Sequence, residues 1–263
     1  MARAQQGVQS IEIGFALLRA LAGSWGALPL KSLAAAASMP AAKAHRYLVS
    51  LIRAGLVVQD AASGRYDLGP FALELGLAAL GRIDPVRIGT EALHALRDRI
   101  NETALLAVWG AGGPTIVRWV ESTRPVTVNV RVGSTLSLLR SATGRVFLAH
   151  LPRTQTRAVL AREGRTVAPS AIERLRARTI RIGLGTVEGD ALPGIAALAA
   201  PIFGHGGALA LVIATLGPQG AFDVRPNGRI ARELRACAAE ASRRLGAQPV
   251  SDGASSAGSA GAR

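Results

Sequence analysis

The chain has 263 residues, enough for two domains, and 49% of them are apolar. Pro201 and a glycine-rich turn at 204–207 interrupt the longest apolar stretch, which argues against a membrane helix. The formal net charge of +14 favours a nucleic-acid partner, yet it is spread along the chain, with +4 on residues 1–82, so motifs carry more weight than charge. Cys237 is the only cysteine and residues 1–7 lack the apolar core of a secretion signal, so we expect a reducing, cytoplasmic setting without an intramolecular disulfide.

The first predicted helix covers residues 10–21. Ser10 is expected to cap its start and Gly23 to end it. Apolar residues recur at helical spacing and predict one packed stripe, formed by Ile11, Phe15, Leu18 and Leu21. This segment would be the first helix of a three-helix core.

Two further helices are predicted around a break at residues 38–40. The Ala-rich run 30–38 predicts the second helix, and Pro40 suits the first position of the third, because its φ is fixed and its missing N–H costs nothing there. Helical spacing predicts a buried stripe on the third helix, at Ala44, Leu48, Leu51 and Ile52. The opposite side is basic and short-chained, with Ala42, Lys43, Arg46, Val49, Ser50 and Arg53.

A hairpin is predicted directly after these helices. Gly55 ends the third helix, residues 56–58 and 65–68 favour two strands, and 60–64 supply turn chemistry. This order of elements is typical of a winged helix-turn-helix, in which a helix enters the major groove of DNA and the wing, here with Arg65, reaches phosphate or the minor groove. A small helical packing module is the alternative interpretation.

The remainder of the chain predicts a linker helix and a longer α+β region. Residues 70–80 are apolar enough that we expect them to pack against another surface, for example the same segment of a second chain. Strands are predicted at 103–109, 115–121, 126–132, 195–202 and 208–216, and helices at 85–100, 144–151, 153–162, 171–182 and 229–245. We therefore expect a sheet of five or six strands flanked by helices. The Ala-, Gly- and Ser-rich residues 247–263 predict a disordered tail.

Three parts of the chain resemble the IclR family of bacterial transcriptional regulators. Residues 39–48, 54–57 and 64–69 are similar to the family's DNA-binding domain. Residues 141–149 resemble its small-residue motif at the start of an effector-domain helix, and 193–202 its apolar strand ending in Ala-Pro. The resemblance covers roughly residues 8–246.

The resemblance implies an α+β protein of two domains. It implies an N-terminal winged helix-turn-helix (1–69), a linker helix used in dimerisation (70–83), a C-terminal GAF-like (profilin-like) effector-binding domain (84–246) and the tail (247–263). Family members are typically dimers or pairs of dimers on operator DNA that repress or activate catabolic genes. We therefore expect a homodimer or tetramer that binds double-stranded operator DNA and a small-molecule effector, without a cofactor, and controls a catabolic operon for a small organic or aromatic compound.

Nine residues are candidates for DNA contact. Arg46 can donate two parallel hydrogen bonds to guanine or grip phosphate, and Lys43 acts as a compact charge. For Arg46 the alternative is an ion pair on a solvated helix face, and for His45 it is packing instead of a phosphate contact. The full set is Lys31, Ser32, Ala41, Ala42, Lys43, His45, Arg46, Ser50 and Arg65. Ser38 occupies a turn position where the family usually has glycine.

The effector-binding positions are carried over from the family's ligand cavity. They are Val128, Ala142, Thr143, Val187, Ile195, Ala197, Ala214 and Leu216. Acid-binding relatives hold Asp, Cys or Ser at several of these positions, whereas here nearly all are apolar. Because a buried carboxylate needs charged or hydrogen-bonding donors, and only Thr143, backbone N–H groups, Arg140 and Arg145 offer them, we expect a largely apolar or aromatic effector with at most one acidic group. Ordinary core packing without ligand binding remains the alternative.

No catalytic residue, metal site or enzyme activity is predicted. The four histidines lack metal-ligand spacing, and the glycines at 110–113 and 204–207 predict hairpin turns instead of a nucleotide-binding loop. The competing function is a winged-helix module that binds partner proteins and carries a degenerate effector domain.

Overall fold

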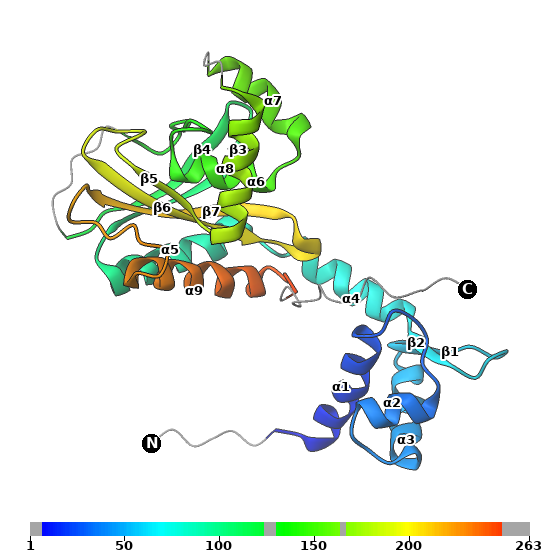
Figure 1. Ribbon diagram of the computed structural model, residues 1–263. Coiled ribbons are helices and arrows are strands. Elements are labelled where there is room, and N and C mark those ends of the chain that lie inside the picture. Colours follow the sequence, from blue (N-terminus) through cyan, green and yellow to red (C-terminus); the bar gives the residue numbers. More distant parts are fainter. Residues whose placement is uncertain (1–6, 124–129, 164–166, 249–263) are drawn as a thin grey trace, which may run out of the picture. The chain divides into compact units, whose positions relative to one another are not determined.

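The computed structural model describes residues 7–123, 130–163 and 167–248, and the chain divides into two compact units after Ile83. The first unit contains four helices and a hairpin within its described part (Figure 1). These are α1 (Gln9–Ala22), α2 (Leu30–Ala36), α3 (Ala41–Arg53), β1 (Val57–Gln59), β2 (Tyr66–Leu68) and α4 (Pro70–Gly81). Leucines from the first three helices form its core with Val57 and Tyr66 from the hairpin.

Helix α1 buries only part of the stripe predicted for it: Leu21 is buried and Leu18 packs against the core, as expected. Its packed residues are Gly14, Leu17 and Leu21, while Ile11 and Phe15 are 57% and 51% exposed. The predicted cap is also wrong, since the helix begins at Gln9 with Val8 at the cap position. The predicted and observed stripes share Leu21 and diverge toward the start of the helix, so periodicity alone could not choose between them.

The turn between α2 and α3 forms as expected, with one shift in the helix start. Pro40 lies at the cap position of α3 with an extended ψ of 141°, so the helix starts one residue later than predicted. Gly55 follows the helix in the left-handed conformation, φ 72°. Ser38 also adopts a left-handed φ of 53°, which explains why glycine suits this turn in the family: a side chain there is strained.

Strands β1 and β2 pair antiparallel and form the predicted wing. Leu28 adds an isolated bridge to Tyr66 and ties the hairpin to the segment before α2. At the tip, the Asp60 side chain accepts hydrogen bonds from the backbone and hydroxyl of Ser63. The Ser63 hydroxyl, more than the backbone N–H groups, lowers the pKa of the Asp60 carboxyl.

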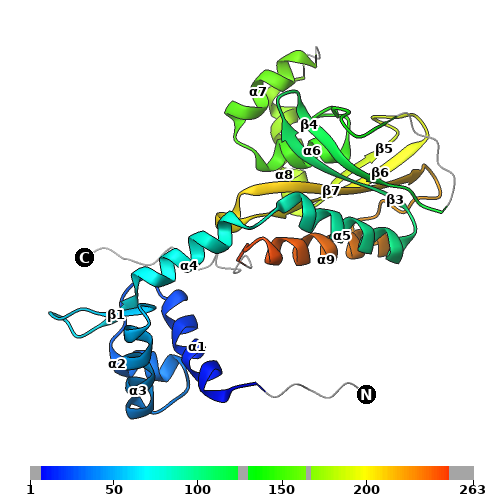
Figure 2. The ribbon, with the colours of Figure 1, turned by 180° about the vertical axis from the view of Figure 1, so that it is seen from behind.

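The second unit is a five-stranded antiparallel sheet in the order β4-β3-β7-β6-β5, covered by helices on both faces. Helices α5 and α9 pack together on one face, and α6 and α8 lie on the other (Figures 1 and 2). The strands are β3 (Thr103–Gly110), β4 (Gly113–Val120), β5 (Gly185–Glu188), β6 (Ile195–Phe203) and β7 (Leu209–Pro218). The helices are α5 (Pro85–Ile100), α6 (Ala142–His150), α7 (Arg153–Arg162), α8 (Pro169–Ile182) and α9 (Arg229–Arg244), with a short turn of 3-10 helix, η1 (His205–Gly207).

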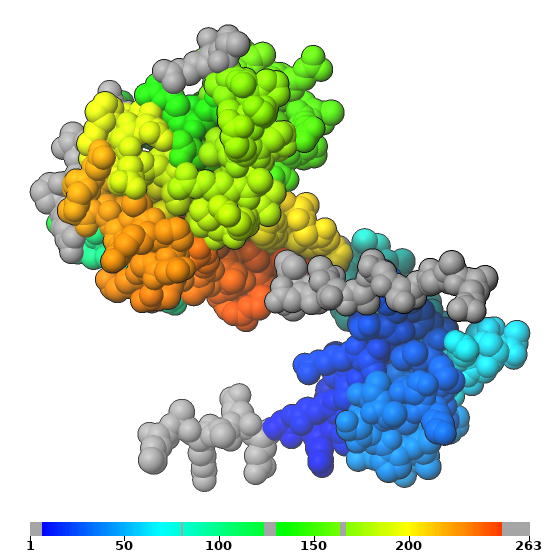
Figure 3. Space-filling view, viewed as in Figure 1, coloured from blue at the N-terminus to red at the C-terminus, as the bar shows by residue number. Residues whose placement is uncertain are grey.

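Helix α9 shows how sequence pattern sets the layers of this unit. Its apolar face, with Leu234 and Ala238 fully buried, packs on α5 and β6. Its other face carries charged residues such as Arg232 and Glu240 and lies on the surface, seen in orange in Figure 3. The predicted helix at 229–245 is therefore confirmed, and the structure adds that it is amphipathic.

The structure of this unit differs from the prediction at two segments. Edge strand β5 was not predicted, because four residues beginning with Gly185 and ending with Glu188 carry too weak an alternation. The predicted strand 126–132 is not supported: residues 130–132 form no strand, and 124–129 lie outside the described residues. Most of the predicted tail, 249–263, also lies outside them.

Candidate DNA interface and effector cavity

The outer face of α3 is open and basic. All nine residues predicted to contact DNA are exposed. Ala42, Lys43, Arg46, Tyr47 and Ser50 line one open concavity along the helix. Tyr47 was not predicted there; it follows Arg46 by one residue and lies half-buried at the border of this face.

The charges on α3 have no acidic neighbour on the helix. Residues 41–53 contain no Asp or Glu, and within the described part of the chain neither Lys43 nor Arg46 forms an ion pair. The ion-pair alternative for Arg46 therefore finds no support. A cationic face without internal neutralisation is what a phosphate-bearing ligand needs.

The remaining DNA candidates lie on neighbouring elements. Lys31 and Ser32 lie in the first turn of α2, and Arg65 directly precedes β2 with a guanidinium hydrogen bond to the carbonyl of Ala27 at 3.4 Å. His45 places Nδ1 3.5 Å from the hydroxyl of Tyr66. This contact connects α3 to the wing.

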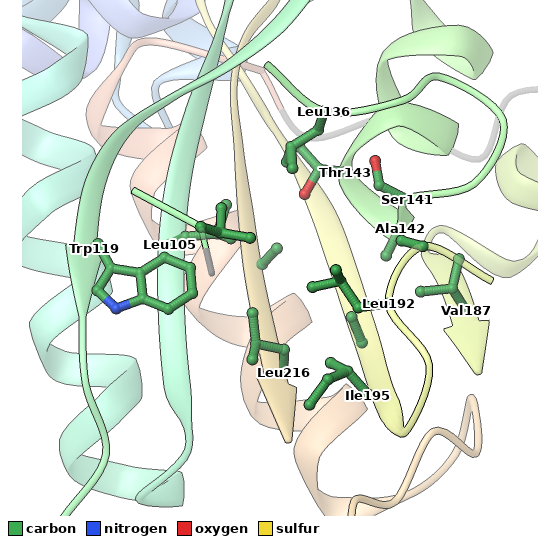
Figure 4. A pocket seen from close by; sticks show the side chains of 14 residues that line it. Leu105, Trp119, Leu136, Ser141, Ala142, Thr143, Val187, Leu192, Ile195 and Leu216 are labelled. Carbon is green, nitrogen blue, oxygen red and sulfur yellow. The ribbon is translucent and has the colours of Figure 1, made fainter. Parts of the chain in front are cut away.

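Seven of the eight predicted effector positions line one cavity in the second unit, between the sheet and the N-terminal end of α6 (Figure 4). The eighth, Val128, lies outside the described residues. Seven further residues also line the cavity: Leu105, Trp119, Val130, Leu136, Ser141, Ala191 and Leu192. Its volume is about 60 Å³.

Two glycines explain why α6 can lie so close to its neighbours. A Cβ on Gly144 would fall on the carbonyl oxygen of Ser137 and 2.6 Å from the Cα of Leu138. A Cβ on Gly185 would likewise fall on the carbonyl oxygen of Ala142. The small residues of segment 141–149 therefore allow backbone to pack on backbone, which brings the helix start to the cavity wall.

The polar groups of the cavity gather at the start of α6. The Ser141 hydroxyl caps the helix, accepting from Gly144 N at 2.8 Å and donating to Ser137 O at 2.6 Å. The Thr143 hydroxyl points into the cavity (Figure 4), its residue is only 3% exposed, and no hydrogen bond to it is found among the described residues. The N–H groups of Ala142 and Thr143, in the first turn, have no partner within the helix.

The two arginines considered as ligand donors are engaged elsewhere. The Arg145 side chain donates to the carbonyls of Leu139 and Thr186 and pairs with the Asp190 carboxylate at 2.5 Å. Arg140 Nε donates to the carbonyl of Asp190 at 2.6 Å. Neither arginine lines the cavity, so that part of the prediction is wrong.

Within the described ranges, no three His, Cys, Asp or Glu side chains lie close enough together to hold a metal ion. Cys237 is buried, and its thiol donates to the carbonyl of Ala92. Of the helices in the same ranges, none is both long and apolar enough to cross a membrane.

Comparisons with known protein families match both units. The family described as IclR helix-turn-helix domain matches residues 10–61, and the one described as Bacterial transcriptional regulator IclR C-terminal matches residues 77–243. The chain is 33% identical to the glycerol operon regulatory protein of Streptomyces griseus, over 91% of this chain and 97% of that protein. It is 28% identical to the transcriptional repressor IclR of Escherichia coli K12, over 74% of this chain and 75% of that protein.

Solved structures agree with these matches. HmgR of Pseudomonas aeruginosa is 41% identical, with a TM-score of 0.87, over 91% of this chain and 98% of that chain. The repressor BlcR of Agobacterium tumefaciens, 24% identical with a TM-score of 0.78 over 93% of this chain and 100% of that chain, shares the fold.

Proposed function

Because the chain belongs to the IclR family of bacterial transcriptional regulators, we propose that it binds operator DNA through α3 and the wing, and a small-molecule effector in the cavity beside α6. The observation that carries the proposal is the exposed face of α3, where Lys43 and Arg46 stand without an ion-pair partner among the described residues. As a regulator of bacterial genes, the protein acts in the cytoplasm. Relatives named for glycerol and acetate operons support control of a catabolic operon.

The nature of the cavity wall favours an apolar or aromatic effector with one acidic group. Trp119, Leu136 and Leu192 offer apolar surface. The Thr143 hydroxyl, which has no hydrogen-bond partner among the described residues, and the first-turn N–H groups of α6 offer donors at one end. A helix N-terminus stabilises a carboxylate through these N–H groups and its dipole. One carboxylate at the α6 end, with the rest of the molecule among apolar side chains, matches this arrangement.

We propose that the protein assembles as a homodimer or a pair of dimers, with residues 1–69 as the DNA-binding domain, 70–83 as the linker and 84–246 as the effector domain. Exposed apolar side chains on α4, among them Phe71, Leu73 and Leu77, support a contact with a second copy, as do Ile11 and Phe15 on α1. Effector binding would then favour one dimer geometry and change the spacing of the two α3 helices.

Thermal unfolding tests the effector site. We expect at least one compound in a panel of aromatic acids and small organic acids to raise the melting temperature of the full chain, because a ligand that binds only the native state stabilises it. The largest shift is expected from an aromatic acid. If no compound in the panel shifts the melting temperature, effector binding is contradicted and the alternative, a winged-helix interaction module with a degenerate effector domain, gains support.

A further inference from the structure

The cavity is too small, as the structure shows it, for the effector class proposed above. Its volume is about 60 Å³. Sites that bury a drug-sized ligand enclose on the order of 300 Å³ or more. Some part of the cavity wall must therefore move before an aromatic acid can enter.

Residues 189–194, the loop between β5 and β6, form one wall of the cavity. Ala191 and Leu192 from this loop line it, and Figure 4 shows Leu192 reaching in from the loop toward the strands. The other walls are sheet strands and α6, which belong to the packed core of the unit, together with Val130 and Leu136 from the segment before α6. Residues of the loop lie half-buried or exposed, so it has little packing to lose when it moves.

The loop has the backbone features of a segment that moves as a unit. Gly189 and Gly194 at its two ends have φ values of 76° and 77°, a region that glycine enters without strain. Gly189 N donates to Ile195 O at 2.9 Å and Gln219 N donates to Gly194 O at 2.8 Å, so both ends are fixed to the sheet. Movement would be confined to the residues between them.

Between these ends, the loop is held down through Asp190. Arg145 on α6 pairs with the Asp190 carboxylate at 2.5 Å, and Arg140 Nε donates to the Asp190 carbonyl at 2.6 Å. The Arg145 side chain is 16% exposed and is fixed by two further hydrogen bonds to carbonyls, so it is already oriented for this pair. Asp190 is 47% exposed, and solvent screening therefore keeps the pair weak enough to break.

We infer that residues 189–194 are a cover over the effector cavity, and that the contacts of Arg140 and Arg145 with Asp190 hold it closed and control ligand entry. The inference rests on the proposed function, since it assigns the regulation of access to the same cavity. Arg140, Arg145 and Asp190 are positioning residues in this account. They act on the loop and do not contact the effector.

Thiol labelling tests the cover without any ligand. Cys237 is the only cysteine, so a Cys237→Ala background with Ala214→Cys places one reporter thiol on the buried cavity wall. With methyl methanethiosulfonate as the probe, Asp190→Asn should raise the labelling rate of the full chain about tenfold, which corresponds to ~1.4 kcal/mol less favourable loop closure. Asp190→Glu should restore most of the protection, because it keeps the carboxylate.

The matched control removes an ion pair on the same face of the unit but away from the cavity. Glu173→Gln breaks the pair between Arg153 and Glu173, joined at 2.8 Å, and should leave the labelling rate unchanged. The inference would be overturned if Asp190→Asn were labelled at the same rate as the Cys237→Ala, Ala214→Cys protein that it is made in. An increase in labelling rate with Glu173→Gln as large as that with Asp190→Asn would overturn it as well. Ala197→Cys is the second reporter if Ala214→Cys fails to fold. Failure of the proposed function can be told apart from failure of this inference. In that case Asp190→Asn would still raise the labelling rate, but no acid in the panel would raise the melting temperature.

Discussion

Replacing Lys43 and Arg46 together by alanine is expected to lower the affinity for operator DNA by about two orders of magnitude, since a good contact to a base edge contributes ~1–3 kcal/mol. The slope of log affinity against log salt should also become shallower by about 0.9 for each phosphate contact removed. Fluorescence anisotropy of a labelled operator duplex at several salt concentrations measures both quantities. The expected size follows from the exposure of both side chains on α3, neither of which forms an ion pair within the described part of the chain.

The control for this double variant keeps the same change in net charge. Arg174→Ala with Arg178→Ala removes two exposed arginines from α8, in the second unit, and should leave DNA affinity nearly unchanged. If both double variants bind the operator like the unchanged protein, the α3 face does not contact DNA. That outcome would favour the protein-interaction module over the regulator.

Gly144→Ala is expected to destabilise the second unit by about 1–3 kcal/mol, because overpacking a well-packed site forces backbone to move. The added Cβ would fall on the carbonyl oxygen of Ser137, and the nearest atoms it meets are all backbone, so no flexible side chain can move aside. Since α6 supplies Ala142 and Thr143 to the cavity, any shift of the helix would also weaken effector binding. Urea denaturation followed by circular dichroism measures the loss of stability.

A second glycine in the same unit provides the comparison for Gly144. A Cβ on Gly204 would meet Ala210 and Ala208 only at ordinary contact distance, 3.8 and 3.9 Å, so Gly204→Ala should change stability little. If the two variants unfold at the same urea concentration, the close backbone packing of α6 has been misassigned. The small residues of segment 141–149 beside the cavity would then need another explanation.

Local sequence chemistry was sufficient to predict the order of elements in the DNA-binding unit, but not the rotation of helix α1. Pro40 directly precedes α3 and Gly55 follows its last residue by two, because each has a backbone preference that few other residues share. Helix α1 has no such constraint on its rotation. Its buried stripe at Leu17 and Leu21 depends on packing against α2 and α3, and the sequence offers Phe15 and Ile11 as an equally apolar choice.

The cavity could be predicted only in part from the chain. The small-residue segment and the strand around Ala197 carried the resemblance, and their positions converge in the structure. Trp119 and Leu136 were missed because they come from segments without a motif and reach the cavity only through sheet pairing and the path of the loop before α6. Arg145 was misassigned for a similar reason, since its partner Asp190 lies 45 residues away in sequence.

The most direct test is the affinity of the protein for its operator with and without the acid that stabilises it most. We expect the acid to change this affinity at least about fivefold in the unchanged protein, the lower end of typical allosteric coupling. Ala197→Leu, which fills part of the cavity, should bind the operator equally well and lose the response to the acid. An unchanged operator affinity in the presence of a bound acid, or a full response in Ala197→Leu, would contradict a regulator controlled from this cavity.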